Sequence, residues 1–303
     1  MIDGKSLLRT LRESLNEAST SEFLDTRTSY EYLYEAAIEF VSRTDCLKLT
    51  QSITTVANQA GYTLNADFMK LYLKNSSNKY YIKYNDGSTN HFINFRDYED
   101  IVFGNNTTSQ PIPNYFTIID DPTKDTKLSS TTTSVGASSG GETILTDTNA
   151  NFADVSAGDI VHNITDGSDG VVLSKTSSTV LVTALFGGTN NDYTSGDSYV
   201  IQPQARLQLI FDPPPSTAGH TVTVYYIQRP DPVFSDYGIY RIQGQYLGAL
   251  VEYAAFKYKY RDREPNFGDK FFQQWSSQIK KSNVVLNKAF VRKDWTVNMM
   301  KRR

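Results

Sequence analysis

Residues 241–260 read Arg-Ile-Gln-Gly-Gln-Tyr-Leu-Gly-Ala-Leu-Val-Glu-Tyr-Ala-Ala-Phe-Lys-Tyr-Lys-Tyr, and this pattern predicts a helix with two apolar faces. The first face holds Ile242, Tyr246, Ala249, Leu250, Tyr253, Phe256 and Tyr260. The second face, roughly 120–180° around the helix, holds Leu247, Val251, Ala254 and Tyr258. A helix that is apolar on two sides must be covered on two sides. We expect one cover from its own domain and the other from a further domain or a second subunit.

The sequence after this helix predicts one more helix and then a basic tail. The second helix has an apolar stripe through Phe271, Trp275 and Ile279. Residues 241–303 contain fourteen Lys/Arg against five Asp/Glu. The last fourteen residues mix aromatic, sulfur and cationic side chains and are too few to bury a core of their own. Because residues 257–264 alternate basic with aromatic and acidic side chains, we expect this end to dock on a protein rather than on DNA.

Residues 28–43 predict an amphipathic helix. Tyr30, Leu33 and Phe40 share its apolar face, and Thr28 with Glu31 fits a capping box.

Beyond Leu49 the apolar period changes to two, which predicts short strands up to residue 119. Asn85-Asp-Gly87 supplies a hairpin turn between two of them. The same Tyr-rich strand pattern returns at residues 206–211 and 221–227. We therefore expect these strands to complete one antiparallel sheet.

The composition changes between residues 128 and 204. This stretch holds nine of the eighteen glycines, and Lys175 is its one basic residue against eight carboxylates. Short apolar segments alternate there with Asp-Gly and Gly-Gly turns, which predicts a small β-barrel or sandwich inserted into the main fold.

Few residues of the sequence suggest a catalytic or metal-binding role. No apolar run is long enough to span a membrane, and the one cysteine, Cys46, excludes a disulfide within the chain. The three histidines lack metal-ligand spacing, and no nucleophile, zinc or phosphate-loop motif appears. Asp166, Asp169 and Asp197 offer oxygen ligands for calcium, but Asp-Gly pairs are first of all turn formers. We therefore predict no catalytic, cofactor or metal site, and no cofactor.

These patterns predict an α+β fold with a helical-bundle core and an antiparallel β-sheet, an inserted small all-β domain and an extended C-terminal arm. The predicted parts are residues 1–127 and 205–289 for the core, 128–204 for the insert and 290–303 for the arm.

Several segments resemble the head-to-tail adaptor (connector) proteins of tailed bacteriophages. The resemblance covers most of residues 1–127 and 205–303. Its marks are a Tyr/Ala/Glu-rich helix ending in Arg43-Thr-Asp-Cys46, the strand Thr50-Gln-Ser-Ile53 followed by Gly61-Tyr62, and Ile227-Gln-Arg-Pro-Asp231 leading into the two-faced helix.

The resemblance implies a virion structural protein, not an enzyme. It implies a ring of twelve copies at the head–tail junction, between a portal protein and a tail or nozzle protein. Genomic DNA would pass through the lumen during packaging and ejection, without sequence-specific binding. Assembly would take place in the host cytoplasm with no membrane involved, and the insert is a candidate attachment point for tail fibres.

Two groups of residues carry the expected contacts. The predicted portal-docking arm places apolar groups in grooves and pairs cations with acidic groups. Its residues are Phe290, Arg292, Lys293, Trp295, Met299, Met300, Lys301, Arg302 and Arg303. The residues predicted to pack within or between subunits are Tyr30, Leu33, Phe40, Tyr253, Tyr258 and Tyr260.

Two other functions stay open at this point. The acidic insert could belong to a tail-associated carbohydrate-binding or depolymerising protein, because a glycosidase carboxylate pair need not be adjacent in sequence. A monomeric cytosolic binding protein with a basic tail is the other alternative.

Overall fold

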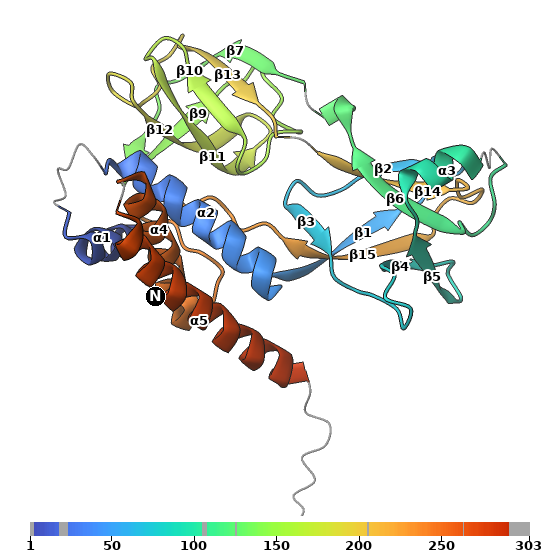
Figure 1. The fold of residues 1–303 in the computed structure, drawn as a ribbon. Coiled ribbons are helices and arrows are strands. Elements are labelled where there is room, and N and C mark those ends of the chain that lie inside the picture. The colour runs from blue at the N-terminus through green and yellow to red at the C-terminus, as the bar shows by residue number, and fades with distance from the viewer. Residues whose placement is uncertain are drawn as a thin grey trace, which may run out of the picture. The chain divides into compact units, whose positions relative to one another are not determined.

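The computed structural model describes residues 3–17, 24–104, 108–124, 126–204, 206–262 and 264–290, and these form two compact units. The helical unit contains Leu7–Cys46 and the chain from Ile242 onward, and the β unit contains Asp3–Ser6 and Leu47–Arg241. Figure 1 shows both. No helix in the described part of the chain is long and apolar enough to cross a membrane.

The helical unit contains the two-faced segment predicted from the sequence and most of four helices. Its helices are α1 (Gly4–Leu15), α2 (Thr26–Thr44), α4 (Leu247–Arg261) and α5 (Pro265–Phe290), with a 3-10 turn at Gly244–Tyr246. The N-cap of α2 is Asp25, whose side chain accepts a hydrogen bond from the Thr28 backbone N–H at 2.6 Å; the predicted cap at Thr28 is wrong.

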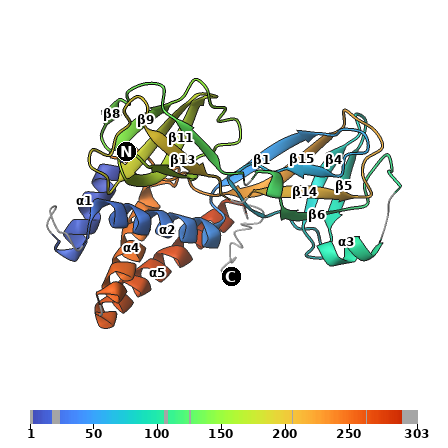
Figure 2. The same cartoon turned by 90° about the horizontal axis from the view of Figure 1, so that it is seen from above.

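α4 is covered on both apolar sides from within the same chain. α2 and α5 lie beside it (Figures 1 and 2), and residues of both predicted faces, including Leu250 and Ala254, are fully buried. The expectation that one face needs a further domain or a second subunit is therefore wrong, because α2 and α5 supply the two covers.

The larger sheet of the β unit has eight strands. The strand order is β1 (Lys48–Thr54), β15 (Thr221–Gln228), β4 (Tyr81–Asn85), β5 (Asn90–Phe95), β6 (Tyr115–Asp120), β14 (Leu207–Asp212) and β2 (Gly61–Thr63), with β3 (Phe68–Leu71) also paired to β15. All pairs are antiparallel except β5 with β6. The Gln51 side chain of edge strand β1 donates to the Thr63 carbonyl of the other edge strand, β2, at 3.2 Å, and accepts from the Asn65 N–H at 2.9 Å. These bonds nearly close the sheet into a barrel. A short helix, α3 (Tyr98–Gly104), and a 3-10 turn at Pro122–Lys124 accompany it.

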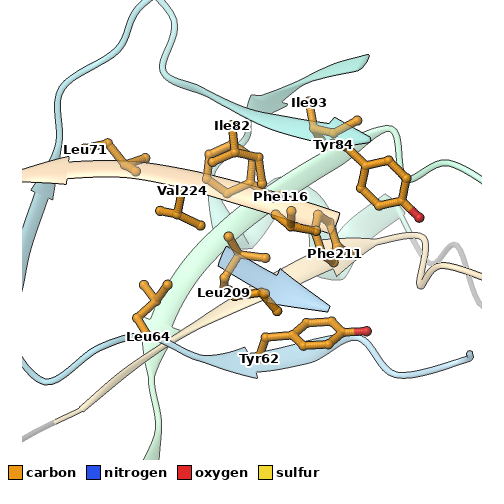
Figure 3. Close-up of a cluster of buried hydrophobic side chains, with 12 residues drawn as sticks. Tyr62, Leu64, Leu71, Ile82, Tyr84, Ile93, Phe116, Leu209, Phe211 and Val224 are labelled. Carbon is orange, nitrogen blue, oxygen red and sulfur yellow. The ribbon is translucent and has the colours of Figure 1, made fainter. Parts of the chain in front are cut away.

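One face of this sheet forms an aromatic core. Figure 3 shows its side chains pointing toward one another, with the Tyr62 and Tyr84 hydroxyls toward the same end. The rings of Tyr62 and Tyr84 each meet the Phe211 ring edge-on, with centroids 5.8 and 6.1 Å apart. The core members are Ile53, Tyr62, Leu64, Leu71, Ile82, Tyr84, Ile93, Phe116, Leu209, Phe211, Val222 and Val224.

Residues 128–202 form a second sheet of seven strands, which we call the β module. Its order is β7 (Leu128–Thr131), β13 (Ser198–Gln202), β10 (Ile160–Asn163), β11 (Ser168–Ser177), β12 (Val180–Phe186), β9 (Glu142–Thr146) and β8 (Ser138–Ser139), all antiparallel. Asp169-Gly170, predicted as a turn, lies inside β11. A Cβ at Gly170 would be 1.7 Å from the Ala184 carbonyl oxygen, so glycine allows β11 and β12 to approach. The core members are Leu145, Phe152, Val155, Val161, Val172, Leu181, Leu185, Tyr193, Tyr199 and Ile201.

The predicted fold class is wrong: the protein is mostly β and has no helical-bundle core. Helices account for about 28% of it, and two large clusters of buried apolar residues lie in the sheets. The helical segments have long, clear periods, whereas most strands are short and pair across large sequence separations. The sequence pattern therefore gave the helices too much weight.

Candidate functional site

A run of aromatic rings joins α4 to α5 in the helical unit. We call Tyr253, Phe256, Tyr260, Phe272 and Trp275 the aromatic ladder. Successive ring centroids lie 4.7–5.6 Å apart, the range in which aromatic pairs attract. At the buried end, the Arg43 guanidinium of α2 lies over the Trp275 ring, 4.8 Å from its centroid.

The ladder opens to solvent at the connection between the two helices. Tyr260 is 47% exposed, Phe272 is 36% exposed, and Phe267 in the first turn of α5 is 55% exposed. We call these three residues the end patch. The Tyr260 hydroxyl donates to Asp269 at 2.6 Å, a bond that raises the pKa of the tyrosine. A Cβ at Gly268 would be 2.6 Å from the Tyr260 ring, so glycine lets this ring lie against α5.

The six residues predicted for subunit packing separate into two groups. Tyr30, Leu33, Phe40 and Tyr258 are buried within the helical unit. Tyr258 also donates to Glu17 at 2.6 Å, and this hydrogen bond adds to burial in raising the pKa of the tyrosine. The other two, Tyr253 and Tyr260, belong to the ladder, and only Tyr260 is exposed.

The predicted portal-docking arm lies outside the described residues, apart from the backbone of Phe290 at the end of α5. Sequence reasoning missed Phe267 and Phe272. Their signal was present, since Phe272 precedes Trp275 by three residues and neighbours it on the helix.

The carboxylates of the β module bind its own turns and strands. Asp166 accepts from the backbone N–H groups of Asn190 and Asn191, at 2.9 and 3.0 Å. Asp197 accepts from the Thr194 N–H at 2.8 Å and from Asn163 Nδ2 at 3.0 Å. Among the residues that the structure describes, no group of three or more His, Cys, Asp or Glu is placed to hold a metal ion.

Asp147 and Asp159 are the most deeply buried carboxylates of the module. Asp147 accepts from the Ser130 hydroxyl at 2.5 Å and the Tyr199 hydroxyl at 2.8 Å. Both oxygens of Asp159 lie 2.9 Å from Nη2 of Arg206, just before β14, in an almost completely buried ion pair. These two buried carboxylates therefore have donors within the β unit: Asp147 inside the module, and Asp159 in Arg206 just outside it.

Three aromatic rings of the module lie in its core. Phe152, Tyr193 and Tyr199 are buried there, and Phe186 packs on Phe234 outside the module at 6.3 Å. These four are all the Phe, Tyr and Trp residues between positions 128 and 204. Within this fully described stretch, no exposed Phe, Tyr or Trp ring is available to stack on a sugar.

Comparison with protein families adds the deciding observation. Residues 126–289, more than half of the chain, match the model of the SU10 adaptor protein family. The chain belongs to this family. It is therefore a phage adaptor-type structural protein. No curated protein matches the chain.

The extent of the match shows which parts are common to the SU10 adaptor family. It begins two residues before β7 and ends one residue before the end of α5. The β module, β14, β15 and the α4–α5 pair thus belong to the region the family model describes. The resemblance seen in residues 1–127 lies almost entirely outside this region.

Proposed function

We propose that this adaptor is a non-enzymatic head-to-tail connector in the phage virion. Twelve copies form a ring between the portal protein and a tail or nozzle protein, and genomic DNA passes through the lumen during packaging and ejection. The observation that carries the proposal is the family match over residues 126–289. The basic, apolar arm that follows directly after the matched region supports it.

In this proposal the arm of residues 290–303 docks on the portal. It begins where the family match ends, and it combines Trp295, Met299 and Met300 with five cations. Aromatic and arginine side chains are enriched among residues that dominate binding energy. An arm that orders on a partner can cover a large surface while the rest of the protein stays unchanged.

The end patch is the second proposed contact and faces a neighbouring copy in the ring. Tyr260, Phe267 and Phe272 present apolar ring surface at the end of a helix pair. A head-to-tail ring joins two different surfaces of each subunit, so the patch would meet a surface other than itself.

Deletion of residues 290–303 tests the portal contact. We expect the truncated protein to keep the thermal midpoint of the full chain and to lose co-sedimentation with its cognate portal protein. A chain of full length with Lys280→Gln and Lys281→Gln is the control for loss of positive charge, because both residues are exposed on α5. Co-sedimentation of the truncated protein at full stoichiometry would show that the arm is not the docking element.

The ring contact has its own test. Tyr260→Ser, Phe267→Ser and Phe272→Ser together should leave portal binding by the first copy intact and reduce the number of copies bound per portal. Mass measurement of the purified complex reads this number. If the triple variant binds in the same number of copies per portal as the wild-type protein, the end patch is not part of the subunit interface.

A further inference from the structure

One strand of the β module presents apolar side chains to solvent. Along β10 and the residue that follows it, exposed side chains alternate with buried ones. Val161 and Asn163 are buried in the module, whereas Ile160 is 41% exposed and Ile164 is 60% exposed. β10 is hydrogen-bonded to β11 on one side and to β13 on the other, so these isoleucines lie on the surface of the sheet and not at its edge. We call Ile160, His162 and Ile164 the β10 face.

The β10 face belongs to an acidic part of the protein. Asp169 of β11 lies across from His162, and the module contains eight carboxylates and one lysine. That lysine, Lys175, donates to two backbone carbonyls of the module, at 3.1 and 2.7 Å. Burial raises the pKa of Asp166 and Asp197, but hydrogen bonds outweigh it and lower both below the ordinary value of an aspartate. These carboxylates are therefore charged at neutral pH.

The cations that border the module leave this acidity in place. Lys124 and Arg206 are paired with Asp154 and Asp159, at 2.8 and 2.9 Å. Residues 124–206, which include both cations, contain nine carboxylates against four basic residues. The module and its borders thus carry a net negative charge.

The helix that carries two residues of the end patch is basic. Residues 270–290 of α5 contain four lysines and no Asp or Glu. The Lys270 ammonium is 5.3 Å from the centroid of the Phe267 ring, and Lys280 and Lys281 are exposed further along the helix. The apolar rings of the end patch therefore lie beside a cationic helix surface.

Four carboxylates near the end patch and α5 have partners within the helical unit. At separations of 2.6–3.7 Å, Asp269 accepts from Tyr260, Asp262 and Glu264 pair with Lys259, and Glu252 accepts from Gln278. None of these contacts uses a lysine of α5.

We infer that the end patch of one copy docks on the β10 face of the next copy around the oligomer. The inference rests on the proposed function and deepens it, because a head-to-tail assembly joins two unlike surfaces and the end patch is one of them. Tyr260, Phe267 and Phe272 contact Ile160 and Ile164, and the lysines of α5 face the acidic module. Contact between two modules or between two α5 helices would bring like charges together, so charge favours this pairing and fixes its orientation.

Disulfide cross-linking on the portal tests the contact directly. The full-length protein carries Phe267→Cys and Ile164→Cys together with Cys46→Ser, is bound to its cognate portal protein and is then mildly oxidised. We expect a ladder of covalent multimers, because each copy becomes linked to a neighbour on both sides. Either new cysteine alone should give no multimers.

The matched control moves one cysteine to another exposed site of the same module. Ser178 lies in the turn between β11 and β12, beyond the end of β11 that is remote from its pairing with β10. Phe267→Cys with Ser178→Cys, also in the Cys46→Ser background, should therefore give no ladder.

A mixing experiment tests the same contact without cysteines. Ile160→Ser with Ile164→Ser removes the apolar side chains of the β10 face, and the end-patch triple variant keeps that face intact. Each variant alone should bind the portal in fewer copies than the wild-type protein. An equal mixture should bind in more copies than either alone, since the end patch of the first variant can dock on the β10 face of the second. Mass measurement of the purified complexes gives the numbers.

Three results would overturn the inference. Covalent dimers from Phe267→Cys alone would show that the end patch meets itself. A disulfide within one chain, formed in dilute protein without portal, would show that the two surfaces meet in a single copy. A mixture that binds in no more copies than its separate components would show that the two surfaces are not partners.

The same samples separate this inference from the proposed function. Protein that binds the portal in the wild-type number of copies and gives no ladder contradicts only the inference. Protein that never binds the portal, yet forms the ladder by itself at high concentration, contradicts only the portal contact. Protein that neither binds the portal nor forms the ladder contradicts both.

Discussion

The β module buries three of its four Phe and Tyr rings and three of its eight carboxylates, whereas the eight-stranded sheet has rings on both faces. Asp147 and Asp197 are buried and bind donors of the module, and the buried Asp159 pairs with Arg206 just before β14. In the larger sheet, a core of buried residues that includes Phe116 and Phe211 lies on one face, and the exposed Phe92 ring lies on the other beside Lys83. The module thus uses its buried carboxylates for stability, while the larger sheet leaves the Phe92 ring exposed on its second face.

The largest expected effect comes from breaking the ion pair between Asp159 and Arg206. Asp159→Ala should lower the free energy of unfolding by about 3–5 kcal/mol, because it leaves a buried guanidinium without its counter-charge. The matched control is Asp154→Ala, whose partner Lys124 is 2.8 Å away in an exposed pair and whose loss should cost about 1 kcal/mol or less. Urea denaturation of both variants measures the difference. Equal costs would mean that the module does not depend on its internal charges.

A smaller loss of stability is expected from removing one tyrosine hydroxyl in each sheet. Tyr199→Phe removes a hydrogen bond to the Asp147 carboxylate and should cost about 1.5–3 kcal/mol. Tyr84→Phe removes contacts with His220 at 2.8 Å and the Pro111 carbonyl at 3.2 Å, and should cost about 0.5–1.5 kcal/mol. Both rings stay buried, so the same urea titration isolates the hydroxyls. If Tyr84→Phe lowers the free energy of unfolding more than Tyr199→Phe does, the hydroxyl in the β module is not the more stabilising of the two.

Low pH should lower the stability of the β module, because the carboxylates of Asp147 and Asp197 become protonated. Burial raises the pKa of Asp147, but hydrogen bonds from Ser130, Asn149 and Tyr199 outweigh it and leave the pKa below the ordinary value of an aspartate. Burial and the bonds from Thr194 and Asn163 act in the same opposed way on Asp197, whose pKa is also lowered. Their stabilisation is therefore complete above the unfolded pKa and is lost as the pH falls through the lower folded values.

Hydrogen exchange at pH 3 and pH 6 checks this acid effect. After correction for the intrinsic pH dependence of exchange, the amides of Val161 and Val172 should lose protection at pH 3. In Asp147→Asn this additional loss should be smaller, because the variant has no carboxylate to protonate there. An unchanged acid response in the variant would exclude Asp147 as its source.

The local elements of this fold were predictable, and their assembly was not. The 3.6 period over residues 28–43 and 241–260 predicted helices where α2 and α4 lie. Asn85-Asp-Gly87 predicted the hairpin between β4 and β5, where Gly87 has a φ of +96°. Both signals lie within a few residues of the structure they specify.

The balance between helix and sheet depended on contacts that no local pattern contains. β1 pairs with β15 across more than 160 residues, and Gln51 links the sheet edges through a side chain that reads as an ordinary polar residue. In the candidate site, Tyr260 was predicted but Phe267 and Phe272 were missed. Apolar spacing marks a helix face without showing which of its rings the neighbouring helix leaves exposed.

The smallest expected change in stability is at Phe92, on the face of the eight-stranded sheet opposite its buried core. Because its ring is 63% exposed, Phe92→Ser should alter the free energy of unfolding by no more than about 0.5 kcal/mol. Phe116→Ala, on the buried side of the same sheet, should cost about 3–5 kcal/mol and serves as the control. Thermal and urea unfolding of both variants give the comparison. A loss above about 2 kcal/mol for Phe92→Ser would show that this exposed ring stabilises the sheet as a core ring does, and the contrast between the two faces would fail.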